Sequence, residues 1–189
     1  MFFLRYTSDV ITRFGNDSRV AIWDLYNEPS GSPLVLQLLE QVYTTAVRAN
    51  PQQPLTSAPF TTDLSGAIPQ FQINSSDIIT FHNYAPLSGT MENIVALRQF
   101  NRPLICSEYM ARSAGSTFHT HTKYYHAEKI GAINWGLVAG KTQTYFPWGS
   151  KPNTPIPLVW FHDIFNNTGE PYSPYEIQFF KDLKLERPS

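Results

Sequence analysis

Two glutamates in this sequence follow apolar runs in the same way. The first run begins at Val20 and leads to Glu28, which Pro29 follows, and the second begins at Leu104 and leads to Glu108. Apolar runs of this length predict β-strands, and a proline closes a strand because it cannot donate to the hydrogen-bond ladder. We therefore expect strands over residues 20–28 and 102–110, each with a glutamate near its carboxyl end.

A pair of carboxyl groups suits the hydrolysis of a glycosidic bond with retention of configuration. In that reaction one carboxylic acid protonates the leaving oxygen and one carboxylate attacks the sugar, across roughly 5–5.5 Å. Strands that are distant in sequence supply such a pair when they lie close in a closed parallel barrel. The carboxyl ends of barrel strands meet at one face, where they hold side chains rigidly.

The residues around both glutamates resemble the clan A glycoside hydrolases, which include the family 5 cellulases, mannanases and xylanases. The stretch Trp-Asp-Leu-Tyr-Asn-Glu-Pro at 23–29 looks like the acid/base motif of that clan, and Ser-Glu-Tyr at 107–109 looks like its nucleophile strand, 80 residues from the first glutamate to the second. The resemblance implies a retaining β-glycosidase that acts on β-linked glycans or glycosides by double displacement. It assigns the acid/base to Glu28 and the nucleophile to Glu108, and it implies no cofactor and no metal.

The same resemblance implies four substrate-binding residues. Asn27 matches the asparagine that bonds the sugar hydroxyl next to the reacting carbon, and Trp135 matches the aromatic floor of the cleavage subsite. His82 and Tyr84 match a His-x-Tyr motif whose side chains contact substrate and the nucleophile, and a spacing of two puts them on one face of a strand. Ordinary packing roles remain open for His82, Tyr84 and Trp135, because large aromatic side chains are more often core than sugar platforms.

Hydrophobic period and punctuation predict a first helix followed by five strand–helix units. This α/β pattern indicates part of a (β/α)8 TIM barrel, namely strands 4–8 with the first three strands absent, in one domain over residues 1–189. Ser173 and Glu176 have the spacing of a capping box. The proline-rich segment 139–168 is expected to form an active-site loop. The expected strands cover 20–28, 54–60, 78–84, 102–110 and 131–138, and the expected helices 3–14, 35–46, 64–70, 91–100, 116–129 and 173–184.

Composition narrows the class of protein. The chain has 189 residues, 42% hydrophobic and 14% aromatic, and a formal net charge of −1, which is typical of a soluble globular protein and gives no attraction to nucleic acid or anionic membranes. A single cysteine, Cys106, excludes an internal disulfide. We find no signal peptide or membrane-spanning run, so the localisation is left open. His119, His121 and His126 diverge on the expected helix, which predicts a solvated face rather than a metal site.

Two alternatives to the enzyme remain. One is a truncated, inactive half-barrel that binds sugar, and the other is a half-barrel that associates with itself or with another polypeptide. An open sheet of five parallel strands leaves the strands at 20–28 and 131–138 as edges with an uncovered apolar face. Neither strand carries the lysines or internal prolines that protect edges, so we expect a homodimer with carbohydrate as its ligand.

Overall fold

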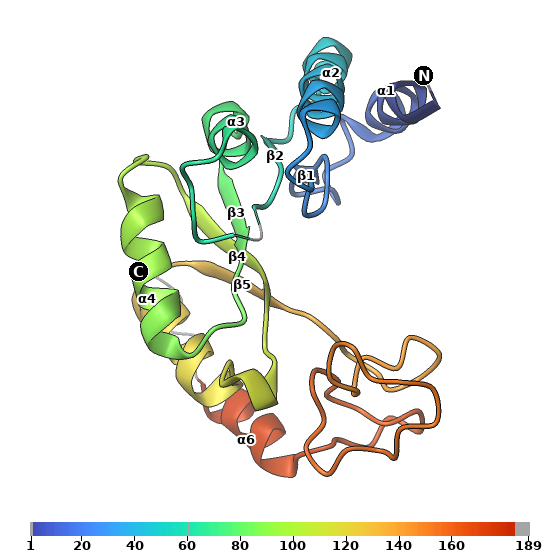
Figure 1. Ribbon diagram of the computed structural model, residues 1–189, viewed down its shortest axis with the longest axis vertical. Coiled ribbons are helices and arrows are strands. Elements are labelled where there is room, and N and C mark those ends of the chain that lie inside the picture. The colour runs from blue at the N-terminus through green and yellow to red at the C-terminus, as the bar shows by residue number, and fades with distance from the viewer. Residues whose placement is uncertain (1, 60, 184–189) are drawn as a thin grey trace. The chain divides into compact units, whose positions relative to one another are not determined.

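The computed structural model describes residues 2–59 and 61–183. In this part of the chain the first helix is followed by five strands, each with a helix after it, as the sequence predicts (Figure 1). The chain forms two compact units, residues up to 82 with 93–107, and residues 83–92 with 108 onward. The helix α4 (Leu87–Arg98) and the strand β4 (Leu104–Tyr109) contribute to both units. A single domain over 1–189 stays a prediction.

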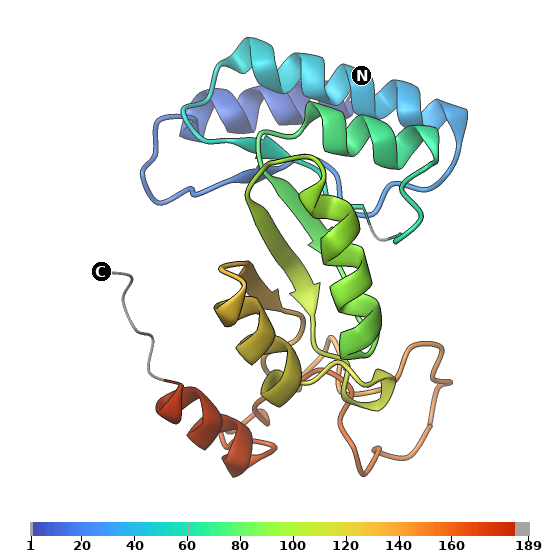
Figure 2. The same cartoon turned by 90° about the vertical axis from the view of Figure 1, so that its left-hand side faces the viewer.

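The first unit is built on three helices. They are α1 (Phe2–Phe14), α2 (Pro33–Ala49) and α3 (Ala67–Ser75). Both views show α1 and α2 side by side, with α3 next to α2 (Figure 2). Proline at the first position of α2 starts the helix, and its apolar stripe turns inward. The buried core of these helices and the adjoining strand consists of Ile11, Leu39, Tyr43, Ala46, Leu55 and Ile68.

The strands of the first unit are shorter than expected. β1 covers Trp23–Asp24 and pairs in parallel with β2 (Leu55–Thr56), with Trp23 opposite Leu55. The predicted strand over 20–28 is therefore wrong at both ends, because after Asp24 only the Leu25 backbone N–H still bonds across, to the Thr56 carbonyl. Beyond that point the Tyr26 carbonyl accepts a hydrogen bond from the Ser57 hydroxyl instead of a backbone N–H. Phe60, the end of the second expected strand, lies outside the described residues.

A second sheet has three strands in the order β3-β4-β5. They are β3 (Ile79–His82), β4 (Leu104–Tyr109) and β5 (Gly131–Asn134), and α4 (Leu87–Arg98) lies between the first two in sequence. β3 and β4 run parallel, because backbone bonds join Ile79 to Pro103 near the start and Asn83 to Glu108 near the end. The prediction of a buried last strand is wrong: the side chains of β5 are exposed or half-buried, with Ile133 58% exposed.

The segment after β4 is less regular than the one helix predicted over 116–129. It contains a 3-10 turn (Arg112–Ala114), a π-helical turn (Phe118–Thr122) and a short helix α5 (Lys123–Ala127). His121 is fully buried rather than on a solvated face. Its ring nitrogens lie 3.1 Å from the Ala85 carbonyl and 3.2 Å from the Thr117 backbone N–H. This correction arises because the π-turn, and not a regular helix, sets the direction of the ring.

The last helix, α6 (Pro174–Asp182), follows a long irregular segment drawn in orange in Figure 2. The predicted capping box does not form, because Ser173 makes no side-chain cap bond. Glu176 instead accepts two hydrogen bonds from Arg112, at 2.8 and 2.6 Å. The helix start is thus held by a contact with a residue 64 positions earlier. Among the described residues no helix is long and apolar enough to cross a membrane.

Candidate active site

In the first unit the candidate acid/base contacts one of the expected substrate residues. His82, the last residue of β3, places Nδ1 2.7 Å from Glu28 Oε1, and an ionised carboxylate accepts the ring N–H there. The histidine side chain is 3% exposed and that of Glu28 is 36% exposed. A buried imidazole therefore fixes a carboxylate that still reaches solvent.

Glu28 has an unusual backbone. Its φ is +46°, in the left-handed region that residues with a Cβ avoid at a cost of about 1–2 kcal/mol. Met110, two residues after Glu108, is also left-handed, with φ +78°. Strained residues of this kind gather at functional sites, where the surrounding contacts hold them in place. Glu28 thus lies in the bend after β1 and not at the strand end that the sequence predicts.

Asn27 lies exposed beside Glu28. It lines a pocket of about 240 Å³ together with residues of β1's continuation and the helices α1 and α2, among them Leu25 and Tyr26. His82 does not line that pocket. Asn27 therefore faces this pocket of the first unit.

Asp24 is a titrating group that the sequence analysis did not select. The residue as a whole is exposed, but neighbouring atoms desolvate its carboxyl group and raise its pKa to about 6. Hydrogen bonds from the Tyr26 and Ala58 backbone and the charge of His82 act in the opposite direction and lower this pKa. The Thr80 hydroxyl also donates to it, at 3.4 Å. Its position four residues before Glu28 is the signal in the sequence that points to it.

In the second unit the candidate nucleophile contacts another expected substrate residue. The Tyr84 hydroxyl donates to Glu108 Oε2 at 2.7 Å. Tyr84 lies two residues beyond the end of β3, so the predicted shared strand face with His82 does not extend to it. Its ring packs edge-on against Trp148, with ring centroids 4.9 Å apart. Packing of the ring thus directs the hydroxyl at the carboxylate.

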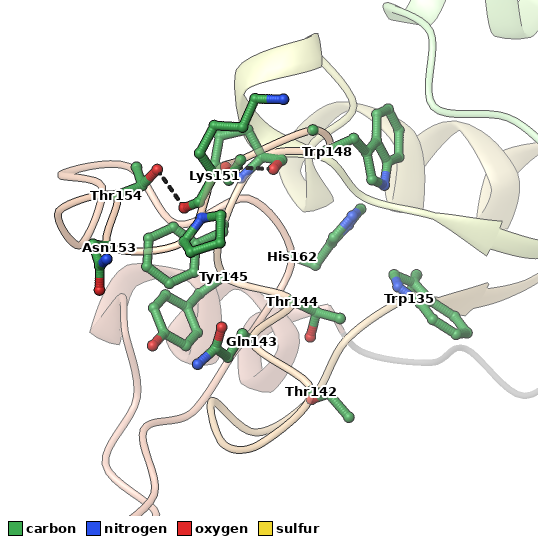
Figure 3. A pocket seen from close by; sticks show the side chains of 15 residues that line it. Trp135, Thr142, Gln143, Thr144, Tyr145, Trp148, Lys151, Asn153, Thr154 and His162 are labelled. Carbon is green, nitrogen blue, oxygen red and sulfur yellow. Dashed lines mark hydrogen bonds between the residues drawn. The ribbon is translucent and has the colours of Figure 1, made fainter.

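A pocket of about 840 Å³ lies in the same unit, formed mainly by the loop after β5 (Figure 3). Trp135 lines it and is 44% exposed, so its indole is available to a ligand rather than packed in a core. Trp148 lines it as well and is 60% exposed. The expectation that the segment after the last strand shapes a pocket agrees with this lining. Whether Trp135 is a sugar platform stays a prediction.

His162 is the pocket residue that the sequence analysis missed. It is 1% exposed, and its Nδ1–H donates to the Met110 carbonyl at 2.6 Å. Its ring packs on Tyr84 and Trp148, with centroids 5.5 and 5.4 Å away. Gly136 makes this position possible, because a Cβ there would lie 2.6 Å from the His162 Cβ. A lone histidine in a long loop gives no periodic signal, so only the tertiary contacts reveal it.

Solved structures share this fold at low sequence identity. A β-D-glucuronidase from Dictyoglomus thermophilum superposes with a TM-score of 0.68 at 14% identity, over 96% of this chain and 35% of that one. β-Glucuronidases from Ruminococcus gnavus and from an uncultured Clostridium species give TM-scores of 0.68 and 0.67 at 15% and 13% identity, over 95% of this chain and 34% and 35% of theirs. The chain spans about a third of the length of these proteins. Its fold is part of a (β/α)8 barrel.

Sequence comparison gives the family. Curated proteins offer no match to this chain. Residues 1–144 match the cellulase family, glycosyl hydrolase family 5. This range contains Glu28, Glu108 and all four expected substrate residues, and it ends before His162. The chain therefore belongs to glycosyl hydrolase family 5, the cellulase family.

Proposed function

We propose that this chain carries the catalytic glutamates of a retaining β-glycosidase, with Glu28 as acid/base and Glu108 as nucleophile. One observation carries the proposal. His82, the last residue of β3, and Tyr84, two residues later, each bond a different one of these glutamates, both at 2.7 Å. Double displacement needs two carboxyl groups with different roles, and a separate hydrogen-bond partner for each glutamate supports this assignment.

The chemistry follows from the two environments. Glu108 accepts the Tyr84 hydroxyl and attacks the anomeric carbon as a carboxylate, so the tyrosine bond fixes which oxygen is directed at the sugar. Glu28 gives its proton to the leaving oxygen and then takes one from water. His82 holds the Oε1 atom of Glu28 through its Nδ1. Trp135 and Asn27 would bind the sugar as a stacking surface and a hydroxyl partner. The acceptable substrates are β-glucosides, mannosides, xylosides and galactosides.

Chemical rescue tests the roles of the two glutamates. Glu108→Ala should abolish hydrolysis of an aryl β-glycoside, and added azide should restore turnover with a product of inverted configuration, because azide replaces the missing carboxylate. In Glu28→Ala, azide should instead attack the glycosyl intermediate and give a product of retained configuration. An inverted azide product from Glu28→Ala would reverse the assignment.

A control separates loss of chemistry from loss of binding. Glu108→Gln has almost the same shape as the wild type and should still bind the sugar while failing to cleave it. If the wild-type chain binds an aryl β-glycoside but never releases the aryl group, the alternative of an inactive sugar-binding half-barrel is correct.

We also propose that the chain forms a homodimer through β5. Among the described residues β5 pairs with β4 alone, which leaves its other edge open. The chain that continues β5 bonds the Phe165 backbone and exposes apolar side chains. Leu137 is 59% exposed and Val138 46% exposed. An open edge beside an apolar face is a template for pairing with a second strand. Light scattering at micromolar concentration should give twice the mass of the chain, and Leu137→Lys should shift it toward the monomer; a folded monomer at all concentrations would refute the dimer.

A further inference from the structure

The His162 ring has one nitrogen with a partner and one without. Nδ1 bonds the Met110 carbonyl, while Nε2 is buried and has no hydrogen-bond partner. A carbonyl oxygen accepts only, so the proton of the neutral ring must be on Nδ1. Nε2 then carries a bare lone pair. A buried acceptor without a donor is destabilised, and a donor from a ligand would restore the missing hydrogen bond.

The surroundings of this nitrogen favour the neutral ring. Burial lowers the pKa of His162, and the nearby Arg112 charge lowers it further, against the Met110 bond and the Asp163 charge, which raise it. Asp163 is itself fully buried, and one of its oxygens accepts the Thr144 hydroxyl at 2.7 Å. Near pH 7 the ring therefore presents an acceptor and no second donor.

The ring lies in the lining of the 840 Å³ pocket together with Trp135 and Trp148 (Figure 3). In that view its tip points toward the Trp148 indole. Aromatic side chains beside a few fixed polar atoms are the usual composition of a site for a small ligand. Lys151 is the one charged residue in the described lining, and it is exposed.

We propose that His162 Nε2 accepts a hydrogen bond from a hydroxyl group of the sugar, and so helps to decide which glycoside binds. The inference rests on the proposed function and deepens it. The Trp148 ring packs on His162 and is itself 60% exposed, so a hydroxyl reaches the buried Nε2 only after Trp148 moves. Because Nε2 is an acceptor, it favours a neutral hydroxyl at this position and disfavours a carboxylate, which offers no donor. At this one position the subsite therefore accepts a hydroxyl and not a carboxylate.

Binding to a non-hydrolysing variant tests the proposal. In the Glu108→Gln background, methyl β-glucoside, mannoside, xyloside, galactoside and glucuronide are titrated by calorimetry. The glycoside that binds most tightly identifies the sugar whose hydroxyl best reaches Nε2. Adding His162→Phe keeps an aromatic ring and removes the acceptor, and should weaken binding of the best glycoside about 2- to 13-fold, the range of one hydrogen bond. Its deoxy analogue lacking the bonded hydroxyl should bind both forms equally.

Two further variants guard the result. His162→Asn keeps a donor for the Met110 carbonyl but has no atom at Nε2, so it should fold and show the same weakened binding if His162→Phe does not fold. His121→Phe replaces another buried histidine, outside the pocket, and should leave affinity unchanged. Unchanged affinity in both His162 variants would overturn this inference alone. No binding of any glycoside to the parent would instead refute the proposed function.

Discussion

Breaking the bond between Arg112 and Glu176 on one side only should strongly destabilise the second unit. The guanidinium donates to both carboxylate oxygens, at 2.8 and 2.6 Å, and to the Trp160 carbonyl at 2.9 Å. It also lies 4.6 Å from the Tyr172 ring centroid. The two charged side chains are only 7% and 9% exposed. One residue thus joins the turn after β4, the pocket loop and α6.

The expected magnitude follows from burial. Arg112→Met keeps most of the side-chain volume but leaves Glu176 buried without its cation, which costs about 3–5 kcal/mol. With a urea slope near 2 kcal/mol per molar, the unfolding midpoint should fall by about 2 M. Adding Glu176→Leu removes the unpaired charge as well, so the double variant should recover a large part of the loss.

Tryptophan fluorescence follows this transition selectively in a Trp23→Phe background, because the other three tryptophans lie in the second unit. Arg19→Met is the matched control, and far-UV circular dichroism follows it because Arg19 lies in the first unit. Its contact with Asp17 is also 2.6 Å, but the Arg19 side chain is 85% exposed, and solvent screening should leave the midpoint unchanged. Equal shifts for Arg112→Met and Arg19→Met would refute the argument from burial. A double variant less stable than Arg112→Met would refute the argument from unpaired charge.

Two other outcomes follow from the structure. Trp135→Ala should weaken glycoside binding by about 1–3 kcal/mol, by analogy with base stacking on aromatic side chains. It should barely change the unfolding midpoint, because the indole is 44% exposed. A destabilised variant with normal affinity would make Trp135 a packing residue. Asp24 has its pKa raised to about 6 in the folded chain, so the folded state holds the proton more tightly and stability should fall as pH rises from about 4 to 6. Asp24→Asn should remove this decrease in urea titrations across that range, and an identical pH profile in the variant would contradict the raised pKa.

The order of the elements could be read from the sequence because the signals for it are local. The apolar stripe of α2 and the proline at its start lie within a few turns of one another, and the five strand–helix units appear where the sequence predicts them. The motif around Glu28 likewise carries the family in consecutive residues. Both kinds of signal are independent of what the rest of the chain does.

The tertiary structure alone decided how far each strand extends and which side chains are buried. β1 ends at Asp24 because its ladder partners end at Thr56, and no pattern within the stretch 20–28 marks that point. Glu176 has the sequence of a capping residue, yet a buried arginine 64 positions away is its stronger partner. His162 is placed by Met110 and by the space above Gly136. In each case the deciding partner is distant in the sequence, so its contribution appears only when the chain is folded.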